Sequence, residues 1–163
     1  MSRTCILVAD RARARLLVPE RLRQSAPFAD AVRLRELQAL VDPEGEMTGN
    51  EVFSNTRSGS NRAPRGATFE YDDHRTRHRE EVERRFAAQI AEKLADFVRE
   101  RGPEKVVLVV EPRMLGLLRP RLWGKLPAAI ETFELPEDLS WHAPSQIQAV
   151  LKQHGALSDA DHE

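Results

Sequence analysis

The apolar run at Lys105–Val110 (KVVLVV) constrains the fold more than any other part of the sequence. A strand with no polar alternation is buried on both of its faces, so it belongs inside a sheet that other elements cover on both sides. The chain has 163 residues, of which 40% are hydrophobic and 31% are charged, and this size and composition fit one globular domain.

The N-terminal residues predict antiparallel strands. Thr4–Ala9 is apolar and Ala12–Val18 alternates between small or apolar residues and arginine, with Asp10 and Arg11 as the turn of a β-hairpin. Leu34–Val41 is a third strand, closed by the turn sequence DPEG.

The C-terminal half predicts helices that alternate with strands. Apolar residues from Val82 to Val98 recur at helical spacing. A short helix at Pro112–Trp123, a strand at Ile130–Leu135 and a helix at Ser145–His154 follow. Antiparallel strands followed by strand–helix alternation predict an α/β fold with a mixed β-sheet flanked by helices. Trp123 and Trp141 are expected to anchor the core or its edge.

We expect residues 1–155 to form a single α/β domain with a long basic loop at about 43–73, because that stretch has neither a strand nor a helix period. Residues 156–163 read as an acidic, flexible tail. His74–Glu81 is compatible with a helix but has no apolar residue, so it has nothing to bury and should project from the domain.

Composition narrows the expected location. The net charge of −1 gives the whole molecule no strong attraction to nucleic acid or anionic lipid. The single cysteine, Cys5, lies in an apolar run and predicts a small buried side chain. The start of the chain does not read as a leader, and no apolar run approaches the roughly 20 residues that cross a bilayer. We therefore expect a cytoplasmic protein with no membrane partner.

The segment from Arg57 to Arg79 is the candidate binding surface. It holds six arginines against three carboxylates, together with two histidines and two aromatic residues. Arginine side chains suit phosphate contacts and aromatic rings can stack on bases. The candidate binding residues are Arg57, Arg62, Arg65, Phe69, Tyr71, His74, Arg75, Arg77, His78 and Arg79. The alternative interpretation is a solvated loop whose charges keep the chain soluble.

Two sets of residues are weak candidates for a metal site. His74, His78 and Glu81 share one helix face, but the catalytic glutamate of the HExxH motif is missing and arginines crowd the same turns. Asp10 and Glu111 follow predicted strands, although two carboxylates are fewer than a nuclease metal site uses, and Asp10 is also explained as a turn residue. We expect no cofactor.

The segments ILVADRARARLL, LVDPEG, RFAAQIAEKLADF, VVLVVEPRMLGLLRPRL and ELPEDLSWHAPSQI follow one another between Arg3 and Leu151. In this order and spacing they resemble the bacterial host-attachment family, the proteins required for attachment to host cells. That family is similar to the central domain of archaeal and eukaryotic peptide-chain release factors. The resemblance implies a ribonuclease-H-like, release-factor-like mixed sheet flanked by helices.

The resemblance does not extend to peptidyl-tRNA hydrolysis. Release factors carry a Gly-Gly-Gln tip on the loop before the long helix, whereas the corresponding residues Arg65-Gly66-Ala67-Thr68 contain no glutamine and no paired glycine. The sequence thus favours a non-enzymatic module that contacts RNA, the ribosome or a protein partner through the Arg57–Arg79 segment. A metal-dependent phosphoester hydrolase of the nuclease type is the alternative, and the oligomeric state stays open.

Overall fold

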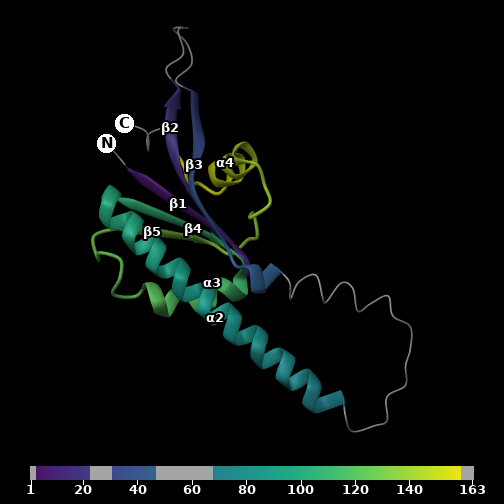
Figure 1. The fold of residues 1–163 in the computed structure, drawn as a ribbon. Coiled ribbons are helices and arrows are strands. Elements are labelled where there is room, and N and C mark those ends of the chain that lie inside the picture. The colour runs from purple at the N-terminus through teal and green to yellow at the C-terminus, as the bar shows by residue number, and fades with distance from the viewer. Residues whose placement is uncertain (1–2, 23–30, 47–67, 159–163) are drawn as a thin grey trace.

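The computed structural model describes residues 3–22, 31–46 and 68–158, which form one mixed β-sheet with helices on both faces (Figure 1). Residues 43–46 form a helical turn. The elements in chain order are β1 (Thr4–Ala9), β2 (Arg13–Leu22), β3 (Ala31–Val41), α2 (Thr68–Arg101), β4 (Lys105–Val110), α3 (Pro112–Leu122), β5 (Glu131–Leu135) and α4 (Pro144–Gln153).

The five strands lie in the order β3-β2-β1-β4-β5. β1 pairs antiparallel with β2, and β2 pairs antiparallel with β3, which confirms the hairpin and the third strand. β4 pairs parallel with β1 and with β5. Three antiparallel strands extended by two parallel ones form a mixed sheet, which confirms the predicted α/β class with a mixed sheet flanked by helices.

Successive side chains of β1 point to opposite faces of the sheet and so belong to two separate cores. Cys5, Leu7 and Ala9 pack with α2 and α3 on one face of the sheet. Ile6 and Val8 pack with residues of α4 on the opposite face (Figure 1). β4 lies between β1 and β5 and is buried along nearly its whole length, as its sequence predicted.

Three element boundaries differ from the sequence prediction, and one of them is the start of β3 at Ala31 rather than Leu34. β2 continues to Leu22 through Pro19. Proline has no N–H to donate, but β1 pairs with β2 only as far as Leu17, so β1 offers no hydrogen bond that Pro19 would fail to make. α2 begins at Thr68, so the last residues of the expected 43–73 loop are helical.

At the C-terminal end, Ala156 and Leu157 were expected to begin a flexible tail, but both are buried in the core on the α4 face. The N–H of Ala156 donates to the carbonyl of Leu151 at 2.9 Å, which holds the chain against the end of α4. Burying these two apolar side chains lowers the free energy of the folded chain, although the neighbouring residues of the segment are polar. Residues 47–67 and 159–163 of the expected loop and tail lie outside the described residues.

Candidate functional site

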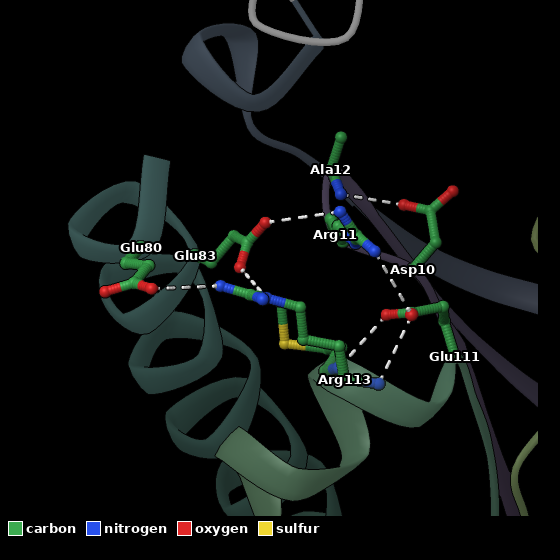
Figure 2. A network of polar contacts seen from close by, with 8 residues as sticks. Asp10, Arg11, Ala12, Glu80, Glu83, Glu111 and Arg113 are labelled. Atoms are coloured by element: carbon green, nitrogen blue, oxygen red, sulfur yellow. Dashed lines mark hydrogen bonds and ion pairs between the residues drawn. The ribbon is translucent and has the colours of Figure 1, made fainter. Parts of the chain in front are cut away.

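Two acidic residues lie where β1 and β4 end. Asp10 directly follows β1 and Glu111 directly follows β4. The N–H of Glu111 donates to the carbonyl of Ala9 at 3.0 Å, which continues the parallel pairing of the two strands. Both carboxylates therefore stand at the same edge of the sheet (Figure 2).

The carboxylate of Asp10 joins the β1–β2 turn to a distant loop. Oδ1 accepts from the backbone N–H groups of Ala12 and Arg13, both at 2.7 Å. Oδ2 accepts from the hydroxyl of the buried Ser140 at 2.7 Å. Asp138 Oδ1 lies 2.6 Å from the same hydroxyl, whose single proton serves one carboxylate at a time. Asp10 thus uses both of its oxygens in holding the fold together.

Glu111 caps helix α3. Its two carboxylate oxygens accept from the backbone N–H groups of Arg113 and Met114, at 3.2 and 3.1 Å. These N–H groups have no partner within the helix, and the negative charge also favours the positive end of the helix dipole. Nη2 of Arg11 lies 3.6 Å from the same carboxylate. Helix capping is therefore sufficient to explain an acidic residue at this position.

Glu83 of α2 is a third carboxylate at this edge, and it was not among the residues predicted from the sequence. It is only 3% exposed. Nε of Arg113 donates to its Oε2 at 2.6 Å, and Nη1 of Arg11 lies 3.7 Å from its Oε1. The hydrogen bond and the charge of Glu83 raise the pKa of Arg113 above its ordinary value. α2, α3 and the β1–β2 turn are thus joined by charged groups (Figure 2).

The spacing along α2 carried a signal for this residue. Glu83 lies one helical turn before Ala87, which continues into Ile90 and Leu94 on the buried face. A carboxylate in line with an apolar stripe needs a buried partner, because desolvating an unpaired charge is costly. Glu83 could therefore have been singled out from the sequence, although its arginine partners could not.

The two arginines determine what this acidic cluster can bind. Arg11 lies between Glu83 and Glu111, and Arg113 pairs with Glu83 and, at 3.7 Å, with Glu80. Guanidinium groups occupy the space beside the carboxylates and repel a second cation. Among the described residues, no group of three or more His, Cys, Asp or Glu side chains could hold a metal ion.

Helix α2 has two parts with different surroundings, which we call the packed part (residues 82–98) and the projecting part (residues 73–81). The packed part lies against the sheet and α3, whereas the projecting part extends past them (Figure 1). Residues 73–78 are exposed, and the first buried side chain is that of Val82. The structure agrees with the expectation that this apolar-free stretch projects.

The predicted binding residues fall into three groups. His74, Arg75, Arg77, His78 and Arg79 are brought together on the projecting part, with only Arg79 partly buried. Phe69 and Tyr71 fall in the first turns of α2, and their side chains are outside the described part of the structure. The remaining three, which lie outside the described residues altogether, are Arg57, Arg62 and Arg65.

The histidines proposed as weak metal candidates do not meet the edge carboxylates. His74 and His78 lie one turn apart on the exposed helix surface. Glu81, the third residue of that set, lies 3.6 Å from Arg85 and is mostly exposed. The two sets of candidates therefore occupy different places in the molecule.

Both tryptophans are exposed, so neither belongs to the core. Trp123 is 88% exposed, because it follows the last residue of α3 and turns into solvent. Trp141 is 71% exposed and lies in the loop before α4, with its ring over the guanidinium of Arg13. Neither tryptophan belongs to a periodic apolar pattern, and the prediction that they anchor the core rested only on their large apolar area.

The fold and this site define an α/β protein whose sheet-edge carboxylates are held by backbone N–H groups and arginines. The family model described as "Protein required for attachment to host cells" matches residues 5–151, and the chain belongs to this family. No curated protein matches the chain. Among solved structures, RuvC of Thermus thermophilus is similar, with 14% identity, coverage of 96% of this chain and 73% of the RuvC chain, and a TM-score of 0.36.

Within the described ranges, none of the helices combines the length and the apolar character that crossing a membrane requires.

Proposed function

We propose that this host-attachment family protein is a non-catalytic module that binds RNA, through the projecting part of α2 and the arginine-rich segment that precedes it. The observation that carries the proposal is the projecting part itself. It has no apolar side chain and no fully buried residue, and it presents Arg75 and Arg77 to solvent. Packing of apolar side chains against the core does not account for the extension of this helix, so we assign its exposed charges to contact with a partner.

The projecting part has three arginines and three carboxylates, and the arginines lie together between Asp73 and Glu80. These grouped guanidinium groups favour phosphate groups as the partner. Arg75 and Arg79 lie one turn apart, whereas Arg77 points to another side, so basic groups surround the helix. Within the described part of the chain, Arg77 and Arg79 form no ion pair. A helix that docks on a protein groove needs apolar anchors along one face, and residues 73–81 have none.

The sheet edge supports a binding role over a hydrolytic one. Asp10 and Glu111 are engaged by backbone N–H groups, and Arg11 and Arg113 neutralise the acidic residues nearby. Phosphoester hydrolysis with a metal ion requires carboxylates that are open to the ion and to the substrate. In this chain the same edge works as a connection between helices and sheet.

The test is RNA binding measured by fluorescence anisotropy, with a labelled single-stranded RNA of about 20 nucleotides at several salt concentrations. The triple variant R75A/R77A/R79A should bind at least about tenfold more weakly than the unaltered protein. Its plot of log affinity against log salt should be shallower by about two, since each lost contact to a single strand removes about 0.7.

A matched variant removes three exposed arginines elsewhere. Arg33 and Arg35 lie on the outer strand β3, and Arg99 lies near the end of α2. R33A/R35A/R99A changes the net charge by the same amount and should keep RNA affinity within about twofold. Equal losses in both triple variants would reduce the proposal to a non-specific charge effect and overturn it.

The segment outside the described residues is tested in the same assay. R57A/R62A/R65A should weaken binding further, an expectation that rests on the sequence alone. No detectable RNA binding by the unaltered protein would contradict the proposal. Capture of a protein that survives ribonuclease treatment and is lost in R75A/R77A/R79A would assign the projecting part to a protein partner instead.

A further inference from the structure

An open pocket of about 350 Å³ lies on the α4 face of the sheet, between β2, β3 and the loop that leads into α4. The small side chain of Ala39, which pairs with Arg15 across β2 and β3, lies at its floor. The exposed side chains of Trp141 and Val41, the latter 46% exposed, stand at its border. A volume of this size lies within the range of small-ligand sites.

Trp141 is exposed, but it is held in place. Its ring centroid lies 4.0 Å from Cζ of Arg13, so one face of the indole rests on a guanidinium group. Nη1 of Arg15 donates to the backbone carbonyls of Ser140 and His142, at 3.1 and 2.7 Å. These two residues flank Trp141, so the backbone on both sides of the ring is fixed. The result is a rigid aromatic surface open to solvent.

The charges of the pocket are already compensated. Arg15 holds Glu36 through two nitrogens, at 2.8 and 3.0 Å, and Nη2 of Arg13 lies 2.6 Å from Glu46. The pocket therefore has little surplus positive charge for a phosphate. It suits a flat, neutral group that stacks on the indole. Nε of Arg13 is buried without a hydrogen-bond partner in the described structure, so the guanidinium is not fully satisfied.

We infer that this pocket takes a nucleobase of single-stranded RNA, which stacks on Trp141. The inference rests on the proposed function, because α2 would supply the phosphate contacts that the pocket lacks. The helical turn of residues 43–46 contacts both the pocket and the packed part of α2: Glu46 pairs with Arg13 beside the pocket, and Glu44 lies 3.7 Å from Arg85. Arg85 is one helical turn from Glu81, where the projecting part ends. Stacking on exposed aromatic rings is how proteins hold unpaired bases with little sequence preference.

The experiment uses the intrinsic fluorescence of the two tryptophans in the full chain. The W123F variant leaves Trp141 as the single tryptophan, and W141F leaves Trp123. Adenosine should quench W123F fluorescence saturably. AMP should do so with an affinity within about twofold of that of adenosine, because the pocket has little net charge. Ribose 5-phosphate, which has no base, should give no quenching. W141F should show no saturable change with any of the three.

The second measurement is RNA affinity by anisotropy. W141A should weaken the binding of single-stranded RNA by about 5- to 150-fold, the fold-change that corresponds to one stacked base. W123A is the matched control, since it removes a tryptophan that is even more exposed, and it should leave RNA affinity unchanged. Thermal unfolding of both variants should match that of the unaltered protein, which separates the loss of stacking from a loss of fold.

The outcomes distinguish this inference from the proposed function. RNA binding that is unchanged in W141A, with no quenching of W123F, would overturn the pocket inference and leave the α2 proposal standing. Saturable quenching by adenosine in a protein that binds no RNA would contradict the α2 proposal and support a nucleoside site. Equal quenching by N-acetyl-tyrosine amide and by adenosine would assign the pocket to protein side chains and overturn the inference.

Discussion

The packed and projecting parts of α2 belong to one continuous helix, and they differ in almost every other respect. The packed part contributes Phe86, Ile90, Leu94 and Phe97 to the core on its face of the sheet. The projecting part contributes no buried side chain at all. Extending an existing helix costs little compared with starting one, so the packed part can support the projecting part with few further contacts, such as the ion pair between Glu80 and Arg113. The residues that form the core and the exposed basic residues are therefore separated along a single element.

The largest effect on stability is expected in the packed part. Phe86 is fully buried, and F86A should lower the free energy of unfolding by about 3–5 kcal/mol, since it removes a large side chain and leaves a cavity. Urea denaturation followed by circular dichroism measures the loss. R77A in the projecting part should stay within about 0.5 kcal/mol. Comparable losses in the two variants would show that the projecting part is packed after all.

The next effect concerns the residue at the boundary of the two parts. E83A should cost about 1–3 kcal/mol, because Arg113 loses a charge-assisted hydrogen bond while its exposed side allows partial hydration. E81A, two residues earlier and mostly exposed, should stay within about 0.5 kcal/mol. The same denaturation experiment compares them. A loss below 0.5 kcal/mol in E83A would mean that Glu80 and Glu111 replace Glu83 as partners of the arginines.

A smaller effect on stability is expected when an exposed residue of α2 is replaced by glycine rather than alanine, in the packed part or in the projecting part. Gln89 is exposed in the packed part, and Q89G should be less stable than Q89A by about 1 kcal/mol, the usual cost of glycine in a helix. R77G should differ from R77A by less than about 0.5 kcal/mol, since the projecting part can unwind without unfolding the domain. A full 1 kcal/mol at both positions would show that the whole helix unfolds as one unit.

The smallest effect is expected at the single cysteine. Burial raises the pKa of the Cys5 thiol to about 12, more than the nearby Arg101 lowers it. The folded protein at pH 8 therefore holds a neutral, unreactive thiol, and the stability linked to this neutral form is lost only as the pH rises from about 9 toward 12. Modification by dithionitrobenzoate should be equally slow in R77G and in the unaltered protein. Faster reaction in R77G would show that unwinding the projecting part opens the core.

Much of the fold could be predicted because burial leaves a periodic record in the sequence. Lys105–Val110 has the continuous apolar pattern of an internal strand, and it lies between two strands in the sheet. The alternation of Ala12–Val18 predicted β2, although not its extension to Leu22, where contact with β1 has ended and the pattern fades. An apolar pattern in the sequence reflects burial of the side chains, so it predicts only the buried part of a strand.

The site was harder to predict because its contacts join residues that are far apart in the chain. Asp10 and Glu111 were placed correctly at strand ends, but their partners were not foreseen: Ser140 for Asp10, and Arg11 for Glu111. The exposure of Trp141 depends on how Arg15 fixes its loop, and Arg15 is 125 positions from Ser140. No local spacing encodes such a contact, so only the folded chain shows it.

The central position of β1 has a consequence for how the chain is made. Thr4 pairs with Lys105, so the parallel partner of the first strand is synthesised about 100 residues after it. At a translation rate of about 5–20 residues per second, this delay lasts roughly 5–20 s. Through that interval the apolar β1 has one unpaired edge that can join a neighbouring nascent chain. The yield of native protein should therefore depend on chaperones that shield the first hairpin until β4 emerges.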